Sequence, residues 1–253
     1  MKGIIVVLAV MHLSGCIGQG NWGESAGFSQ GKSMSQAAME AAKSPQTWVP
    51  LVTAGVLVAA DVDEQWSEDL YQDQPLFGDD AQSVSSDLRD IASGAYVLTA
   101  LLAPSPTVGA KMRGLAVGAG TAVLDGVVNE GLKDLTQRER PDGSNDNSMP
   151  SGHASKAASR TYMARYNLRH IDLPEWSRQV ANWGLHGVAI GTGLARVEAG
   201  KHHLSDVLVG YALGNFVAQF MQFAFLDGRD DGTQITFDPV ERGGVLTLSM
   251  PVR

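Results

Sequence analysis

Six side chains in the second half of this 253-residue chain have types and an order that suit chemistry on a tetrahedral anion: Lys133, Arg140, His153, Arg196, His202 and Asp206. Cations bind phosphoryl oxygens, and a carboxylate beside a histidine can fix which ring nitrogen is free to attack phosphorus. A second histidine can supply the proton that a leaving alkoxide needs. The set therefore predicts hydrolysis of a phosphate ester through a histidine nucleophile.

The first two cations are spaced so that one helix could direct both at a single pocket. Lys133 and Arg140 are seven residues apart, which on an α-helix is two turns, about 10 Å along the axis and about 20° around it. Pro141 disfavours the α conformation at Arg140, so we expect the helix to end there and the guanidinium to enter the site. A lone cation at a helix C-terminus more often only interacts with the helix dipole, but the PSGH segment that follows favours a functional role.

Pro150-Ser151-Gly152-His153 predicts a helix start, with Ser151 as the N-cap of an Ala-rich helix. The free N–H groups and the positive end of the dipole would face an anion there. Gly152 would let an oxyanion approach closely, and His153 would be the general acid. Taken alone, the tetrapeptide could be a simple capped turn.

The third segment places His202 and Asp206 four residues apart, so they share a face if the segment is helical. We interpret His202 as the nucleophile, Asp206 as its orienting carboxylate and Arg196 as a planar clamp on two phosphoryl oxygens. His203 is a competitor because Asp206 is also at its i+3 position. Helical spacing alone does not separate the two histidines.

The order K-DLTQRE-RP, PSGH and R-VEAGK-H-HLS-D resembles the motifs of the type 2 phosphatidic acid phosphatase superfamily, which includes bacterial acid phosphatases and vanadium haloperoxidases. The third motif of that superfamily, SR, five residues, H, three residues, D, favours His202 over His203. This chain departs from it at Ala195, where the family has a serine. The matches extend from Lys133 to Asp206.

The resemblance implies an all-α helical bundle of the phosphatidic acid phosphatase and vanadium chloroperoxidase type, and a metal-free reaction through phosphohistidine. No cofactor is expected, although vanadate could bind as a phosphate mimic. Three alternatives stay open: a vanadate-dependent haloperoxidase, a non-catalytic envelope lipoprotein scaffold, and phosphotransfer to an acceptor other than water. The expected substrate is a phosphorylated lipid, including pyrophosphates, or a small phosphomonoester.

The N-terminus predicts a bacterial lipoprotein. Gly3 to Leu13 is mostly apolar, and Leu13-Ser14-Gly15-Cys16 matches a lipobox, so Cys16 would be the acylated first residue of the mature protein. The alternatives are an ordinary secretory signal or a buried N-terminal helix. The expected location is the cell envelope, lipid-anchored to the outer membrane and facing the periplasm. Cys16 is the only cysteine, so an intramolecular disulfide is excluded.

The elements that must position these residues are mostly helical. Hydrophobic periodicity predicts helices over 37–43, 48–66, 86–102, 108–138, 152–168, 174–197 and 203–225. The acidic 67–83 segment has no clear period and is expected to be a loop. Apolar stretches at 184–194 and 207–226 are interrupted by polar residues, so we interpret them as core helices.

The chain end alternates polar and apolar residues on both sides of Gly243-Gly244, which predicts a small C-terminal β-hairpin. The predicted organisation is a signal peptide at 1–15, a tether with a short helix at 16–47, a helical phosphatase domain at 48–228 and the hairpin at 229–253. The net charge of −8 argues against a nucleic-acid partner. The histidines and acidic residues outside the motifs show no metal-ligand spacing.

Overall fold

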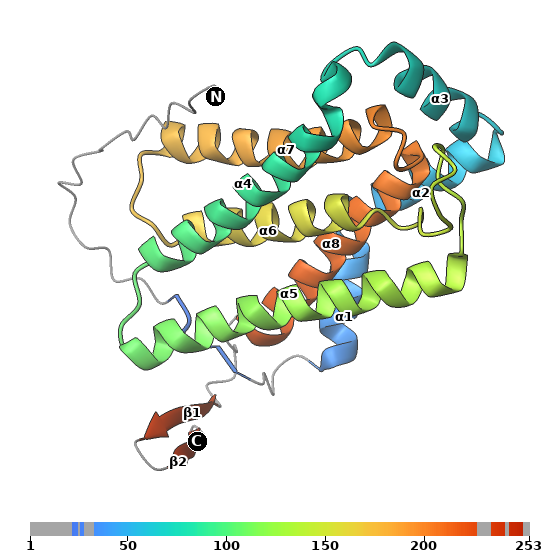
Figure 1. The fold of residues 1–253 in the computed structure, drawn as a ribbon. Helices are drawn as coiled ribbons and strands as arrows, with labels where there is room; N and C mark the ends of the chain where they lie inside the picture. Colours follow the sequence, from blue (N-terminus) through green and yellow to red (C-terminus); the bar gives the residue numbers. More distant parts are fainter. Residues whose placement is uncertain (1–21, 25, 28–32, 227–233, 241–242, 250–253) are drawn as a thin grey trace.

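The computed structural model describes residues 22–24, 26–27, 33–226, 234–240 and 243–249 (Figure 1). The helices are α1 (Met34–Lys43), α2 (Pro45–Ala59), α3 (Asp63–Asp73), the short 3-10 helix η1 (Gly78–Asp80), α4 (Ala81–Leu102), α5 (Val108–Thr136), α6 (Gly152–Leu168), α7 (Glu175–Glu198) and α8 (Leu204–Phe225). The strands are β1 (Gln234–Val240) and β2 (Gly243–Ser249). The predicted helical bundle is therefore present, and cysteine 16 with the signal segment lies outside the described residues.

The helix α6 lies at the centre of the bundle and packs against α4, α5, α7 and α8. Its buried face consists largely of alanine, serine and threonine, which allow close approach of its neighbours. On α8, Gly210 and Gly214 face the backbone of α6, since a Cβ at either position would lie within 2.4 Å of the carbonyl oxygen of Ser151 or Ser155. This close contact fixes the start of α6 against the start of α8, and both histidines of the predicted site lie there.

Polar side chains make a contact between the packed helices α5 and α6. Asp125 is fully buried, and the hydroxyls of Ser155 and Ser159 both donate hydrogen bonds to its carboxylate. Burial raises the pKa of Asp125 in spite of these bonds. The pair of serines therefore sets the register of α6 on α5, where apolar side chains alone would allow sliding.

The helix expected over 48–66 is two helices, because the chain turns at Asp61, whose φ is 56°. The acidic segment expected to be a loop is mostly helical, since α3 extends to Asp73. In α3 the buried residues are Asp63 and Ser67, which hydrogen-bond to the start of α8 instead of packing apolar groups. A helix held by polar contacts has no hydrophobic period, so the sequence pattern misses it.

Part of the expected tether packs on the bundle. Trp22 and Ala26 are both buried, and the indole N–H of Trp22 donates to the side-chain oxygen of Asn167 at 2.8 Å. Gly114 of α5 lies under the indole ring, where a Cβ would come within 2.6 Å of it. An isolated aromatic residue in a Gly- and Ser-rich segment gives no periodic signal, which is why the sequence suggests a free tether.

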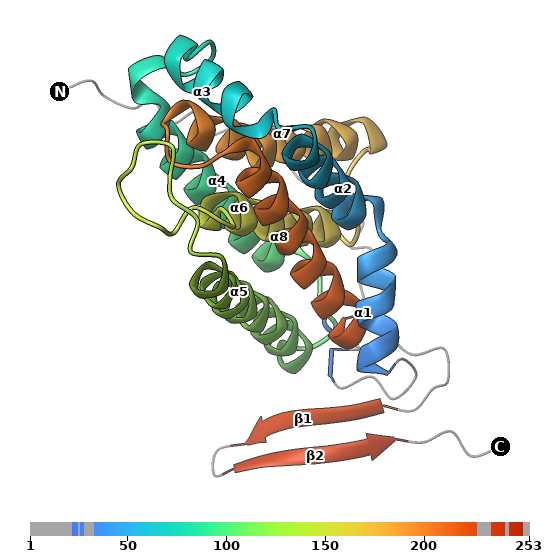
Figure 2. The same cartoon turned by 90° about the vertical axis from the view of Figure 1, so that its right-hand side faces the viewer.

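At the chain end, β1 pairs antiparallel with β2, with Gln234 opposite Ser249 and Val240 opposite Gly243 (Figure 2). The glycine pair expected at the turn lies in β2 instead, because Gly244 is opposite Pro239.

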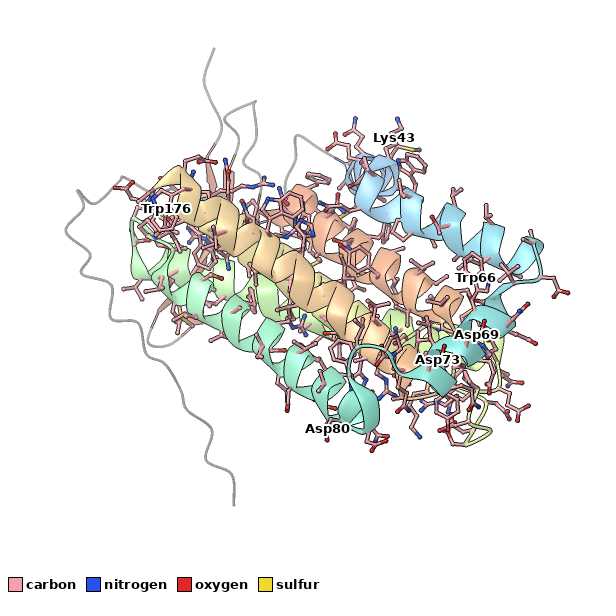
Figure 3. The ribbon with its side chains drawn as sticks, turned by 90° about the horizontal axis from the view of Figure 1, so that it is seen from above. Lys43, Trp66, Asp69, Asp73, Asp80 and Trp176 are labelled. Atoms are coloured by element: carbon pink, nitrogen blue, oxygen red, sulfur yellow. The ribbon has the colours of Figure 1, made fainter. Side chains whose placement is uncertain are left out.

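The outer surface of the bundle has many exposed apolar side chains. They include Val49, Leu51, Val52 and Val56 of α2; Val97, Leu98, Leu101 and Leu102 of α4; Val108, Met112, Val123 and Val127 of α5; and Trp176, Val180, Trp183 and Ile190 of α7. Figure 3 places Trp176 at one end of the bundle and Trp66, Asp69 and Asp73 at the other. Among the helices described, α8 alone is long and apolar enough to cross a membrane, and 56% of its apolar window is buried in the bundle.

Candidate active site

A cavity of about 560 Å³ brings six of the predicted residues together: Lys133, Arg140, Gly152, His153, Arg196 and His202. It lies where the C-terminal ends of α5 and α7 meet the starts of α4, α6 and α8. Helices that run in opposite directions thus place residues far apart in sequence around one space.

Lys133 and Arg140 reach the cavity by different routes. The helix α5 ends at Thr136, and Gln137 has a left-handed backbone with φ of 44°, so Arg140 lies on the loop beyond the helix and not two turns along it. Lys133 remains in the last turn and pairs with Glu130 at 2.8 Å. Lys133 and Arg140 therefore reach the same cavity as predicted, but a loop and not the helix brings Arg140 there.

At the start of α6, Ser151 is the N-cap by position, but its hydroxyl makes no capping hydrogen bond. That hydroxyl is buried and has no partner among the described residues. The first N–H groups of the helix have no intrahelical acceptor. Gly152 is next to the cavity, where a Cβ would lie 3.1 Å from the side-chain oxygen of Asn129 and 3.5 Å from the Lys133 amine. Because Gly152 has no side chain, the N-terminus of α6 remains accessible to an anion.

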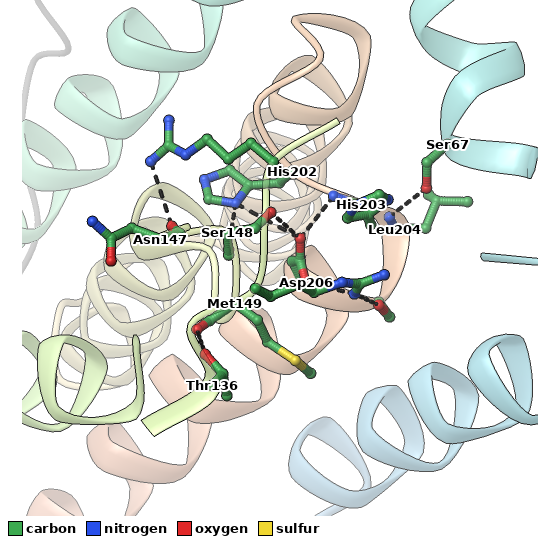
Figure 4. Close-up of polar contacts among 12 residues, drawn as sticks. Ser67, Thr136, Asn147, Ser148, Met149, His202, His203, Leu204 and Asp206 are labelled. Carbon is green, nitrogen blue, oxygen red and sulfur yellow. Dashed lines mark hydrogen bonds and ion pairs between the residues drawn. The ribbon is translucent and has the colours of Figure 1, made fainter. Parts of the chain in front are cut away.

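His202 is held by a backbone carbonyl, as Figure 4 shows. Its Nδ1 lies 2.6 Å from the carbonyl oxygen of Ser148, which can only accept a hydrogen bond, so Nδ1 bears the proton and Nε2 has the free lone pair. Burial, with Arg196 and Arg140 nearby, lowers the pKa of His202 well below its ordinary value. The ring is therefore neutral, with the tautomer that a nucleophilic Nε2 requires.

Asp206 does not hydrogen-bond to His202, which corrects the direct pairing expected from the sequence. Its Oδ2 is 4.0 Å from Nδ1 of His202. The carboxylate instead accepts hydrogen bonds from the Ser148 hydroxyl and from the N–H of His203 (Figure 4). Asp206 thus positions Ser148, whose carbonyl orients His202, and acts on the imidazole ring only indirectly.

Arg138 is a residue that the sequence analysis missed. Its guanidinium donates to Asp206 at 2.8 Å and to Asp63 at 2.9 Å, and so joins α3 to the start of α8. Both carboxylates also bond to neighbouring serines: Asp63 accepts from Ser205, and Asp206 accepts from Ser148. The only sign of Arg138 in the sequence is its position two residues before Arg140 in a segment rich in cations. Its two acidic partners, Asp63 and Asp206, are distant in the chain.

Among the cations of the cavity, Arg196 gives the strongest indication of an anion-binding site. Only 6% of it is exposed, and no carboxylate pairs with it within the described part of the chain. Burial, followed by repulsion from Arg140, lowers its pKa to about 10. The hydroxyl of Ser85 on α4 lies 3.5 Å from its NH1, so a serine from another helix is next to the arginine although Ala195 precedes it in sequence. An unpaired buried charge is costly unless a ligand compensates it.

His153, in the first turn of α6, lies beside Arg89 of α4, another residue that the motifs do not include. The Arg89 NH1 is 3.0 Å from Nε2 of His153. Burial, followed by Arg196, Arg89, Lys156 and Lys133, lowers the pKa of His153 to about 4. The proton that a general acid needs is therefore absent at neutral pH until a negative charge enters the cavity.

Several buried polar atoms near the cavity have no hydrogen-bond partner in the described residues: the side-chain amide of Asn129, Nε of Arg140, Oγ of Ser151 and Nε of Arg196. Unpaired buried donors are rare in native proteins and need an explanation. Here all four side chains can donate to an oxyanion. The arrangement can therefore hold a tetrahedral anion in front of Nε2 of His202.

His203 and His186 do not line this cavity. His203 lines a different hollow with Glu64, Glu68 and Arg138, which favours His202 as the nucleophile. His186 contacts the guanidinium of Arg165 at 2.7 Å. Over the described ranges no group of three His, Cys, Asp or Glu side chains could hold a metal ion.

Comparison with known proteins gives a consistent result for the second half of the chain. Residues 114–227 match the sequence profile of the PAP2 superfamily. The chain is 38% identical over 100 residues to the lipid A 1-phosphatase of Porphyromonas gingivalis, which covers 40% of this chain and 21% of the relative. It is 30% identical over 96 residues to phosphatidylglycerophosphatase B of Bacillus subtilis, covering 36% of this chain and 47% of the relative. The matches thus span less than half the length of both curated relatives.

The fold also has a solved counterpart. The crystal structure of the first transmembrane PAP2 type phosphatidylglycerolphosphate phosphatase from Bacillus subtilis superposes with a TM-score of 0.53, over 71% of this chain and 96% of that one. The two chains are 22% identical, so the likeness concerns the fold.

Proposed function

Because residues 114–227 belong to the PAP2 superfamily, we propose that this protein is a metal-independent phosphatase that hydrolyses phosphate esters of membrane lipids through a phosphohistidine intermediate. The single observation that supports it best is the pairing of an uncompensated buried cation, Arg196, with a neutral His202 in one cavity. A buried guanidinium without a carboxylate is expected where the anion arrives with the substrate.

In the first step, Nε2 of His202 attacks phosphorus in line and the bond from phosphorus to the leaving oxygen breaks. Lys133, Arg140, Arg196 and the N–H groups at the start of α6 stabilise the equatorial oxygens. The negative charge of the bound phosphate raises the pKa of His153, which can then donate its proton to the leaving oxygen. The carbonyl of Ser148 keeps the proton of His202 on Nδ1 while Nε2 becomes bonded to phosphorus.

In the second step, water attacks the phosphohistidine, and the bond from phosphorus to Nε2 breaks. His153, now without its extra proton, accepts one from the attacking water. Inorganic phosphate leaves, and both imidazoles return to their starting protonation states.

A lipid substrate is supported by the outer surface of the bundle. On α5 the exposed positions from Val108 to Val127 are apolar, and this stretch is about 30 Å long, close to the thickness of a bilayer core. The helix α7 also has exposed tryptophans, Trp176 and Trp183. Such apolar surface is larger than scattered single residues and favours contact with lipid. We therefore place the bundle in contact with the cell-envelope membrane, in addition to the lipid anchor proposed at Cys16.

Membrane contact can be tested apart from the anchor by flotation with liposomes. The Cys16→Ala variant should still float, and adding Val123→Glu and Val127→Glu should release it. Ser83→Glu, at the exposed start of α4, is the matched control. Flotation that depends on Cys16 alone would contradict contact through the helices.

The reaction itself is tested by trapping the intermediate. Quenching in alkaline detergent after reaction with a ³²P-labelled lipid phosphate should give a base-stable, acid-labile phosphoenzyme in the wild type and none in His202→Ala. The His203→Ala variant is the control and should be labelled normally. Activity should survive EDTA and be inhibited by vanadate. Normal turnover by His202→Ala would overturn the assignment.

The role of His153 is tested by changing the leaving group. His153→Ala should lose most of its activity on an alkyl phosphate, whose alkoxide needs a proton, and much less on an aryl phosphate, whose phenolate leaves unaided. Equal losses on both substrates would contradict the general-acid role. A side-by-side comparison of phosphatidic acid, a polyprenyl pyrophosphate and an aryl phosphate would identify the preferred substrate.

A further inference from the structure

The helix α3 supplies hydrogen-bond acceptors to the beginning of α8, immediately after His202. The first N–H groups of an α-helix have no acceptor within the helix. Here the hydroxyl of Ser67 accepts from the N–H of Leu204 at 2.9 Å, and Asp63 accepts from the N–H of Ser205 at 2.8 Å. Two side chains of a different helix therefore cap α8, and they fix where the segment that contains the histidine lies.

A third contact of α3 lies just before His202 in the chain. Gly200 has a positive φ of 65°, and a Cβ at this position would lie 2.8 Å from the ring of Tyr71. The glycine therefore lets the segment pack closely on α3. Among the described residues that line the cavity around His202, none belongs to α3. This helix thus holds the histidine segment from outside the site.

Asp63 is the charged member of these contacts, and only 3% of it is exposed. Besides the N–H of Ser205, its carboxylate accepts from the Ser205 hydroxyl and from NH2 of Arg138, the latter at 2.9 Å. Burial acts to raise the pKa of Asp63, but the hydrogen bonds from Ser205 and Arg138 outweigh it and lower that pKa below its ordinary value. Replacing a buried ion pair by apolar side chains is often neutral or stabilising, so stability alone does not explain this charge.

The same guanidinium connects Asp63 to the residue that orients His202. Arg138 is held from two sides, because its NH1 donates to Asp206 at 2.8 Å. The main-chain carbonyl of Arg138 accepts from the N–H of Ser148 at 2.9 Å, and the carbonyl of Ser148 lies 2.6 Å from Nδ1 of His202. Asp63 is therefore connected to both ends of this last hydrogen bond. The start of α8 leads to the histidine, and the arginine leads to the carbonyl.

We propose that Asp63 is a positioning residue for His202, because it fixes the hydrogen bond from Nδ1 to the Ser148 carbonyl and so directs Nε2 at phosphorus. In-line attack tolerates little displacement, and a misplacement of about 1 Å can cost about 100-fold in rate. The carbonyl lies on a loop and the histidine precedes a helix, so the two need a common anchor. This inference rests on the proposed function, which it deepens by adding a positioning residue from α3.

The first test separates positioning from phosphate binding. Asp63→Asn keeps an oxygen for the N–H of Ser205, but its amide nitrogen cannot accept from Arg138, so the charge and its hydrogen bonds are lost. In a variant that circular dichroism shows folded, kcat on an aryl phosphate should fall by about 5- to 30-fold, since the loss of a hydrogen bond to a charged group reaches the ring in part. The affinity for inorganic phosphate in calorimetry should stay within about twofold, because Asp63 does not line the cavity.

Asp69→Asn is the matched control, since it makes the same change at an exposed position of α3, and it should alter neither quantity. Ser205→Ala is a milder second variant, because it removes one hydrogen bond to Asp63 and keeps both charges of the ion pair; it should lower kcat by about two- to fivefold. Wild-type kcat in folded Asp63→Asn, or in Ser205→Ala if the first variant does not fold, would overturn the inference. So would a loss of phosphate affinity with kcat unchanged.

Proton NMR of ¹⁵N-histidine-labelled protein provides a readout that needs no turnover. The Nδ1 proton of His202, in a hydrogen bond of 2.6 Å, should resonate far downfield and exchange slowly with water, and it is assigned by its absence in His202→Ala. Asp63→Asn should move this resonance upfield and speed its exchange, whereas Asp69→Asn should change neither.

The two proposals fail in different ways. If Asp63→Asn shifts the Nδ1 resonance but His202→Ala hydrolyses phosphate esters normally, the proposed function fails and the positioning of the ring by Asp63 stands. If His202→Ala is inactive while Asp63→Asn keeps the wild-type resonance and kcat, the positioning role fails and the proposed function stands.

Discussion

Asp206→Asn distinguishes the geometry of this site from a direct carboxylate–histidine pair. In a direct pair the carboxylate fixes the histidine tautomer, and its loss costs about 10⁴-fold in kcat in the serine protease case. Here the carbonyl of Ser148 fixes the tautomer, and Asp206 lies 4.0 Å from the ring. The variant should therefore retain the reactive Nε2 and lose only electrostatic support.

The size of that support follows from distance and compensation. Two unit charges 4 Å apart interact by about 4 kcal/mol at an effective dielectric constant of 20. Arg138 lies 2.8 Å from the other oxygen of Asp206 and offsets most of this field at the ring. We expect about 1–2 kcal/mol to remain, which is about 5- to 30-fold in kcat. KM should change little, because Asp206 does not line the cavity.

The assay is steady-state hydrolysis of an aryl phosphate at a temperature where circular dichroism shows the variant folded. Arg138 keeps its contact with Asp63, so the free energy of unfolding should fall by about 1–3 kcal/mol and not more. Ser148→Ala is the matched control, since it removes the hydroxyl that Asp206 holds but keeps the carbonyl, and it should lose less than tenfold. A loss near 10⁴-fold in folded Asp206→Asn would refute the role given to the Ser148 carbonyl.

Three further predictions concern burial, protonation and packing. Arg196→Met should abolish phosphate binding in calorimetry yet raise the free energy of unfolding by on the order of 1 kcal/mol, since it removes an uncompensated buried charge; a less stable variant would contradict this. The pKa of His153 is about 4 against an ordinary 6.5, and that of His202 is also lowered, so the unfolded chain binds more protons in this window and thermal stability should fall from pH 7 to pH 5. His153→Asn should lose less stability over the same range. Gly210→Ala should cost about 1–3 kcal/mol in urea unfolding and reduce kcat, because its Cβ would lie 2.4 Å from the carbonyl oxygen of Ser151. Gly187→Ala on α7, with no neighbour within 4 Å, should instead stabilise by about 0.5–1 kcal/mol without changing kcat.

The helical ranges were predictable wherever a helix buries an apolar or small-residue face. The range of α6 agrees with the sequence pattern at both ends, and those of α7 and α8 agree within one residue. The pattern failed at α3, because its buried residues are Asp63 and Ser67, and at Trp22, because one aromatic residue has no period. In both places the buried contact is with a distant part of the chain, and local hydrophobic periodicity does not reveal such contacts.

The sequence by itself determined which residue types converge, since three cations and two histidines in motif order leave few other chemistries, and all five line one cavity. Only the tertiary structure decided how they are held. The carbonyl of Ser148 took the orienting role expected of Asp206, and Arg138 and Asp63 joined the network from segments with no motif. The physical reason is that hydrogen bonds depend on distances of a few tenths of an ångström between segments. Spacing along a chain brings two residues to the same face but does not select between acceptors that tertiary packing places beside the same ring.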